Sequence, residues 1–180
     1  ITYKIGAPGR HFVLNSLAVL LAVVELGADL ALAGLALADL SAPKGRGAQT
    51  RLALAGGPAI LIDESYNANP ASMRAALSLL GDAQESVPGR RLAVLGDMLE
   101  LGATAPALHA ELAQPIAAAK VDAVYCCGPM MYELWQRLPA GLRGLYAETP
   151  AGLLDRLKED LRPGDVIMIK GSLGSRMGPL

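Results

Sequence analysis

The segment from Asp63 to Pro70 concentrates side chains that are capable of chemistry. Two carboxylates, a hydroxyl, a phenol and two amides lie within eight residues. The amides of Asn67 and Asn69 suit the edge of a purine or the hydroxyls of a ribose, and a carboxylate such as that of Glu64 can hold a ribose hydroxyl or the water of a bound metal. A structural explanation is equally good, because Asn69 in front of Pro70 is a typical helix N-cap. From these residues alone, nucleotide contact and helix capping are equally favoured.

Two further polar loops follow apolar runs. In the segment from Leu95 to Gly102, the carboxylates of Asp97 and Glu100 could take the ammonium group of an amino acid, and an ordinary acidic loop is the alternative. This segment lacks the GxGxxG pattern of dinucleotide sites. Lys170 and Ser172 follow the last apolar run, and their ammonium, hydroxyl and backbone N–H groups could cradle a carboxylate or phosphate. The spacing GxxxxGK[ST] of a phosphate-binding P-loop occurs nowhere in the chain.

Cationic and imidazole side chains lie nearer the amino terminus. The guanidinium of Arg46, on the turn from Pro43 to Gly47, could reach phosphate oxygens across a cleft between domains, and a solvated linker is the alternative. His11 begins a helical pattern with Asn15 one turn later on the same face, so the pair could point at a nucleotide or could be ordinary boundary residues. His109 falls in an amphipathic helix, where we interpret it as a structural residue.

Composition excludes several classes of protein. Of the 180 residues, 52% are hydrophobic and 18% are charged, and the net charge of −1 without a basic stripe gives nucleic-acid binding no electrostatic support. The adjacent Cys126 and Cys127 form neither a disulfide framework nor a zinc cluster. The apolar stretch from Phe12 to Leu40 is interrupted by three carboxylates, so we expect no membrane span.

The elements that must position these groups are short apolar strands alternating with helices. We expect strands at 50–55, 59–63, 92–95, 123–127, 144–147 and 166–169, and helices at 71–80, 105–120, 130–137 and 150–161. Such alternation indicates an α/β fold, with a mostly parallel sheet covered by helices on both faces and a leading β-hairpin. Two helices, 10–26 and 30–40, precede a boundary rich in glycine and proline. In this class ligands bind at the carboxyl ends of the strands, where the polar loops fall.

The order of the motifs resembles the Mur ligase family. Gly9-Arg10-His11-x-x-x-Asn15 is similar to the GRHNxxN segment near the end of the central ATPase domain of that family. The motifs that follow are similar to the branch that adds D-alanyl-D-alanine, and they are KGRG at 44–47, DESYNANP at 63–70, LGDMLELG at 95–102 and KGS at 170–172. Phe12 and Glu64 depart from the family pattern, which usually has Asn and Asp there.

The resemblance implies a cytoplasmic enzyme of three domains that uses ATP and Mg²⁺. Residues 1–42 would be the helical end of the central ATP-binding domain, and residues 43–180 would be a Rossmann-like C-terminal domain. The whole enzyme would add D-alanyl-D-alanine to UDP-N-acetylmuramoyl-tripeptide through an acyl phosphate, in peptidoglycan precursor synthesis. Its remaining domains would be this chain's partners and would supply most magnesium ligands, so we expect the chain alone to be inactive.

The resemblance also assigns roles to individual residues. Arg46 would approach the phosphates, and Glu64 would contact the ribose or orient Arg46, which makes these two the catalytic candidates. The nucleotide contacts would come from His11, Asn15, Asn67, Asn69 and Pro70. The dipeptide contacts would come from Asp97, Glu100, Lys170 and Ser172, and no residue is assigned to a metal. Two alternatives stay open, a Mur-type ligase for another amino acid and a non-catalytic α/β ligand-binding module.

Overall fold

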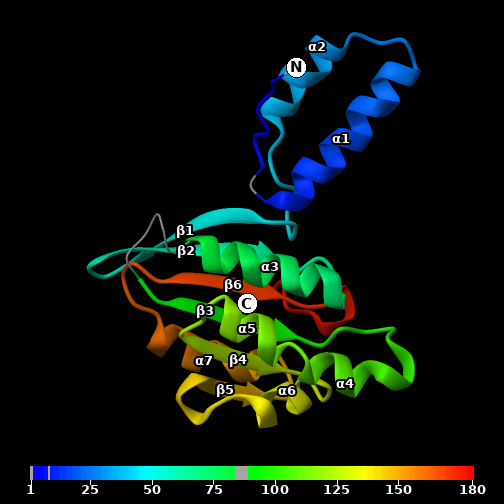
Figure 1. The fold of residues 1–180 in the computed structure, drawn as a ribbon. Helices are drawn as coiled ribbons and strands as arrows, with labels where there is room; N and C mark the ends of the chain where they lie inside the picture. Colours follow the sequence, from blue (N-terminus) through cyan, green and yellow to red (C-terminus); the bar gives the residue numbers. More distant parts are fainter. Residues whose placement is uncertain (1, 8, 84–88) are drawn as a thin grey trace. The chain divides into compact units, whose positions relative to one another are not determined.

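The computed structural model describes residues 2–7, 9–83 and 89–180, and it divides into two compact units (Figure 1). The first unit is Ile1–Pro43 and the second is Lys44–Leu180. Within helix α1, the side chains of Arg10 and His11 lie outside the described part.

The first unit is a pair of helices. Helix α1 spans Arg10–Glu25, helix α2 spans Leu30–Ala36, and a 3₁₀ turn, Leu37–Asp39, follows. The carboxylate of Asp29 caps α2 by accepting the backbone N–H groups of its first turn. None of the helices in the described ranges combines the length and apolar character that a membrane-spanning helix needs.

The second unit is built on a sheet of six described strands. The strands are β1 (Ala48–Leu54), β2 (Gly57–Glu64), β3 (Arg91–Gly96), β4 (Ala123–Cys127), β5 (Arg143–Ala147) and β6 (Val166–Lys170). Their spatial order is β1-β2-β6-β3-β4-β5. Only β1 is antiparallel to its neighbour, so β1 and β2 form the leading hairpin and the other strands run parallel. The predicted α/β fold with a mostly parallel sheet is confirmed.

The helices of the second unit connect these strands. They are α3 (Pro70–Asp82), α4 (Ala105–Ala110), α5 (Ala113–Ala118), α6 (Met131–Arg137) and α7 (Ala151–Asp160). The single helix predicted over 105–120 is wrong, because the chain breaks at Glu111 and Leu112 into α4 and α5. Pro115 explains the break: it has no N–H to donate to the carbonyl of Glu111, and its ring would crowd that carbonyl in a continuous helix.

Helices cover both faces of the sheet, and each face has its own core. On one face, side chains of α3, α5 and α6 pack against the sheet, including Leu77, Ile116 and Leu134. On the other face, Leu153 and Leu157 of α7 pack with Met177 from the end of the chain. Figure 1 shows α3 and α5 lying side by side across their face. The predicted coverage of both faces is confirmed.

Strand β4 contributes to both cores through its two cysteines. Side chains alternate between the faces of a strand, so Cys126 lies in the core under α3 and α6 while Cys127 lies in the core under α7. Both are free thiols and both are buried. Burial raises the pKa of both, that of Cys127 to about 11. The two cysteines therefore serve as small apolar residues.

We predict that both thiols resist labelling in the folded chain at pH 8. With a pKa of about 11, about one Cys127 in a thousand is a thiolate at that pH, against about a quarter for an ordinary cysteine. Reaction with Ellman's reagent should be at least about 100-fold slower for the folded chain than for the chain in 8 M urea. Rapid reaction of either thiol in the folded chain would show that the thiol is not buried.

Candidate functional site

The site predicted from sequence falls at a topological switch point around β6. The segments after β2 and β3 lead to α3 and to α4 and α5, all on one side of the sheet. The segment after β6 turns to the other side, where Met177 packs under α7. The chain therefore continues to opposite sides of the sheet after neighbouring strands, and the carboxyl ends of such strands are the usual place for a ligand in this class. We call these ends of β2, β6 and β3 the carboxyl edge.

A buried ion pair lies at the centre of the carboxyl edge. Lys170 ends β6 beside Glu64 of β2, and its Nζ donates to Glu64 Oε2 at 3.3 Å and to the carbonyl of Asn67 at 2.9 Å. The side chain of Lys170 is only 2% exposed and that of Glu64 is 11% exposed. Burial lowers the pKa of Lys170, the Glu64 carboxylate opposes that effect, and the nearby Arg46 adds to it. Lys170 therefore holds β2, β6 and the loop after β2 together.

The turn that carries Arg46 is fastened to the end of β2. The N–H of Gly45 donates to Asp63 Oδ2 at 3.1 Å, and the N–H of Tyr66 donates to the carbonyl of Gly45 at 3.0 Å. Gly45 has a φ of +74°, and a Cβ there would lie 2.9 Å from the Cβ of Tyr66, so only glycine fits. The exposed guanidinium of Arg46 lies over the Tyr66 ring, with 4.1 Å between Cζ and the ring centroid. The structure thus brings Arg46 to the carboxyl edge.

The two asparagines of the loop after β2 are used differently. Asn69 is the N-cap of α3: its Oδ1 accepts from Ser72 N at 2.8 Å, and Ser72 Oγ accepts from Asn69 N at 3.0 Å. Pro70 is the first residue of the helix. Asn67 is exposed, and its Oδ1 accepts only from the N–H of Ala68, at 2.8 Å. Within the described residues no acceptor meets the Asn67 NH₂ group, so this amide remains available to a ligand.

Asp97 is a helix-capping residue at the end of β3. Its Oδ1 accepts from Met131 N at 2.9 Å, and its Oδ2 accepts from Met130 N at 3.3 Å, at the start of α6. A Cβ on Gly128 would lie 2.5 Å from the Asp97 carboxyl carbon, so the chain passes close to the buried carboxylate. Both carboxylate oxygens already have donors. The role of Asp97 in binding an ammonium group therefore stays a prediction.

Ser172 connects the loops after β2, β3 and β6. Its Oγ accepts from Leu99 N at 2.9 Å and donates to the carbonyl of Ala68 at 3.3 Å. Its N–H donates to the carbonyl of Asp97 at 3.0 Å. Glu100, one residue beyond Leu99, is exposed, has a φ of +63°, and forms no ion pair within the described part of the chain. Glu100 is therefore the free carboxylate of this loop.

The structure brings together all predicted site residues of the second unit. A continuous set of hydrogen bonds joins the segments that carry Glu64, Asn67, Asp97, Lys170 and Ser172. Asn15 belongs to the first unit, where it is exposed on α1, and the side chain of His11 lies outside the described part. The assigned roles stay predictions.

Two residues that were not predicted as site residues help to build the carboxyl edge. Asp63 binds Ser65 through its Oδ1, at 3.1 Å from the N–H and 2.6 Å from the hydroxyl, in addition to the N–H of Gly45. An Asp two residues before a Ser at a strand end is the signal for such an Asx-turn. His109 binds the backbone of the loop after β3, because its Nε2 accepts a hydrogen bond of 2.9 Å from the N–H of Met98. No local pattern signals that contact.

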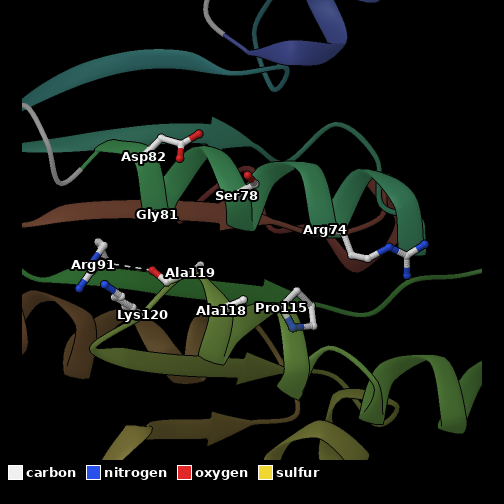
Figure 2. A pocket seen from close by; sticks show the side chains of 9 residues that line it. All are labelled: Arg74, Ser78, Gly81, Asp82, Arg91, Pro115, Ala118, Ala119 and Lys120. Atoms are coloured by element: carbon white, nitrogen blue, oxygen red, sulfur yellow. Dashed lines mark hydrogen bonds between the residues drawn. The ribbon is translucent and has the colours of Figure 1, made fainter.

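A separate groove of roughly 630 Å³ lies between α3 and α5 (Figure 2). It is lined by Arg74, Ser78, Gly81, Asp82, Arg91, Pro115, Ala118, Ala119 and Lys120. Figure 2 shows Arg74 toward one end and Arg91 with Lys120 toward the other, so the cations are spread along the groove. None of the predicted site residues lines it. The groove is distinct from the carboxyl edge.

The chain has an α/β domain whose polar groups gather at the carboxyl edge, where proteins of this class usually bind their ligands. The family model described as "Mur ligase, glutamate ligase domain" matches residues 50–173. The chain belongs to the Mur ligase family, and the relationship inferred from the motifs is confirmed.

Relatives and solved structures agree on one branch of this family. The chain is similar to UDP-N-acetylmuramoyl-tripeptide–D-alanyl-D-alanine ligase of Escherichia coli, with 36% identity over 94% of this chain, and to the ligase of that name from Rickettsia prowazekii, with 32% identity over 93%. It is also similar to the crystal structure of MurF ligase from Thermotoga maritima in complex with ADP, with 26% identity, a TM-score of 0.76 and 98% of this chain covered. The chain spans 36% of the length of each of the first two proteins and 38% of the third.

We predict that the Lys170–Glu64 pair stabilises the fold as a unit. Lys170→Met should lower the free energy of unfolding by about 3 kcal/mol, because it leaves the Glu64 carboxylate in a buried place without its cation. Glu64→Gln should also destabilise the chain, and the double variant should lose less than the sum of the two single losses. Urea denaturation measures all three free energies.

The matched control is Lys158→Met, which removes an exposed lysine of α7 and should change the free energy of unfolding by less than about 0.5 kcal/mol. If Lys170→Met behaves like Lys158→Met, the pair does not hold the carboxyl edge together.

Proposed function

We propose that this chain is the C-terminal part of an ATP-dependent ligase that adds D-alanyl-D-alanine to UDP-N-acetylmuramoyl-tripeptide. The observation that carries the proposal is that relatives matching 93% and 94% of this chain are ligases with that activity in their names. The carboxyl edge supports it, because exposed polar groups suited to nucleotide and amine lie there on one connected scaffold. The product would be a peptidoglycan precursor, made in the cytoplasm where ATP is available.

The nucleotide side of the reaction would use two exposed groups, on Asn67 and Arg46, and the largely buried carboxylate of Glu64. The free NH₂ group of Asn67 would donate to the adenine or ribose, beside Asn69 and Pro70. The exposed guanidinium of Arg46 would move from the Tyr66 ring to the phosphates as the γ-phosphoryl group passes to the substrate carboxylate. Glu64 Oε1, the oxygen that does not face Lys170, would contact the ribose or orient Arg46.

The acceptor side would lie at the ends of β3 and β6. The free carboxylate of Glu100 would take the amino group of the dipeptide, and the third N–H of the Lys170 ammonium would face its carboxylate or the acyl phosphate. The ammonium would first lose one proton to water, and the neutral amine would attack the acyl carbon. As the tetrahedral intermediate collapses, the bond from carbon to the phosphate oxygen would break, phosphate would leave, and the nitrogen would lose a second proton to water. Asp97 and Ser172, whose polar atoms are already engaged, would position the loop from which Glu100 projects.

Magnesium would be bound mainly outside this chain. The described residues contain no group of three or more His, Cys, Asp or Glu side chains placed to hold a metal ion. The family resemblance assigns most magnesium ligands to other domains of the polypeptide, and oxygens of the nucleotide phosphates would complete the set. When bound, the ion would neutralise charge that develops on the phosphates.

The first unit would be the end of the central ATP-binding domain, and it would bring Asn15, and by the family pattern His11, to the nucleotide. Its helices support this assignment through their exposed apolar side chains. Leu14, Leu17 and Leu21 follow one face of α1 at helical spacing and are 56%, 53% and 63% exposed. A helix of this kind normally buries such a face against further structure. In the longer polypeptide, the rest of the central domain would cover it.

We predict that this apolar face makes the isolated chain self-associate. The double variant Leu17→Glu with Leu21→Glu should reduce association of the chain, measured by light scattering, and leave thermal unfolding of the second unit unchanged. In the longer polypeptide the same change should lower stability by several kcal/mol, because it places charges in a covered interface. Equal stability of the two longer polypeptides would contradict the assignment of the first unit.

We predict that the longer polypeptide releases phosphate from ATP when magnesium, UDP-N-acetylmuramoyl-tripeptide and D-alanyl-D-alanine are all present. Omission of the dipeptide should abolish phosphate release. The chain of 180 residues alone should release no phosphate, because it has no P-loop lysine. The measurement is a coupled assay for inorganic phosphate.

Other acceptors distinguish the alternatives. Release that depends on a different amino acid would retain the ligase chemistry and replace the substrate. Folded, magnesium-supplied polypeptide that releases no phosphate with any acceptor would contradict the enzyme and favour a non-catalytic ligand-binding module.

A further inference from the structure

We propose that His109 is a positioning residue for the acceptor amine, a role that rests on the proposed function. Its buried imidazole holds the backbone of the 97–102 loop, so that the Glu100 carboxylate is fixed at the end of β3.

Both ring nitrogens of His109 are engaged in a fully buried place. Nε2 lies 2.9 Å from the backbone nitrogen of Met98, and Nδ1 lies 2.6 Å from the carbonyl oxygen of Ala105. The residue is 0% exposed. A backbone N–H can only donate, so Nε2 accepts from Met98 and the proton of the neutral ring lies on Nδ1, which donates to Ala105. One side chain thus ties the loop after β3 to the first turn of α4.

The loop is held from two sides at consecutive residues. The N–H of Met98 is bound by His109 on α4, and the N–H of Leu99 is bound by Ser172 Oγ in the segment after β6. The carbonyl of Asp97 accepts from Ser172 N. Three successive residues are therefore fixed by side-chain or backbone partners on different elements. The residue that follows them directly is Glu100.

Glu100 has a backbone conformation that needs such support. Its φ is +63°, in the left-handed region that residues with a side chain rarely adopt, and Gly102 follows with a φ of +61°. Such a conformation persists where the surroundings enforce it. Glu100 is exposed and forms no ion pair among the described residues, whereas Asp97 uses both oxygens on α6. The loop presents one carboxylate for a cationic or amine ligand.

An apolar side chain could fill the space of the His109 ring but could not accept the Met98 N–H. A buried N–H without an acceptor is costly, and the loop would move to find water. The effect should reach Glu100, two residues away, before it reaches the nucleotide groups on the loop after β2. Loss of the hydrogen bond should therefore weaken binding of the dipeptide amine and leave ATP binding unchanged.

The first measurement is the N–H···N hydrogen bond itself, by NMR of the uniformly ¹⁵N-labelled chain. A scalar coupling between the Met98 amide nitrogen and His109 Nε2, with the ¹⁵N shifts of a ring protonated only at Nδ1, is the expected result. If no coupling is found at neutral pH, or if Nε2 carries the proton, the proposal is overturned. This measurement needs no variant.

The second measurement is steady-state kinetics of the longer polypeptide. His109→Met keeps an apolar side chain of similar size but removes the acceptor, and it should raise the KM for D-alanyl-D-alanine about tenfold with the KM for ATP unchanged. His109→Gln places Oε1 near the position of Nε2, so it is the matched control and should keep the dipeptide KM within about twofold of the wild-type value.

A double-variant cycle separates positioning from general destabilisation. Glu100→Gln should also raise the dipeptide KM, and adding His109→Met to it should raise that KM little further, because both changes remove one interaction. Fully multiplicative effects, or equal increases in the KM for ATP and the dipeptide, would overturn the proposal. If His109→Met does not fold, His109→Gln and the NMR coupling decide. Absence of phosphate release from the wild-type polypeptide would instead refute the proposed function, and the positioning role with it.

Discussion

The buried ammonium of Lys170 is the constraint on which the carboxyl edge depends. A cation that is 2% exposed must have close partners, and here they are the Glu64 carboxylate and the carbonyl of Asn67. These contacts fix the end of β2 and the path of the loop that follows it. The same loop offers the carbonyl of Ala68 to Ser172, which in turn holds Leu99. One charge therefore sets the relative positions of three loops.

This constraint exists only when the last strand is in place. β6 comes last in sequence but lies between β2 and β3, so it completes both neighbouring ladders. The two cores meet across this strand, with Met168 on one side and Ile167 and Ile169 on the other. Contacts between residues separated by about 100 positions close a long loop, at a cost in chain entropy that the paired strands must offset. The site and the core of the second unit should therefore form in a single step.

The fold could be predicted because its signals are local, whereas the partners at the site are not. Apolar runs, Asn69 with Pro70, and the glycine-rich turns indicate the strands, the start of α3 and the loops. The insertion of β6 between β2 and β3 follows from no local pattern, so the pairing of Lys170 with Glu64 could not be predicted. The capping contacts of Asp97 could not be predicted either, because its partners at the start of α6 are more than 30 residues away in sequence. The break between α4 and α5 could have been predicted from Pro115, but the periodic apolar residues favoured one continuous helix.

The polar residues of the carboxyl edge divide into two groups by what they already bind. In the first group, the polar side-chain atoms already form hydrogen bonds within the protein, and a ligand could bind them only by breaking those bonds. This group contains Asp63, Asp97, Ser172 and His109. Arg46, Asn67 and Glu100 are exposed and retain unused donors or acceptors. In a ligase, the exposed groups could act only if the hydrogen-bonded groups fix their positions. A misplacement of about 1 Å can lower the reaction rate about 100-fold. Substitutions in the first group should therefore affect ligand binding by moving the exposed groups, and substitutions in the second group should remove a contact with the ligand.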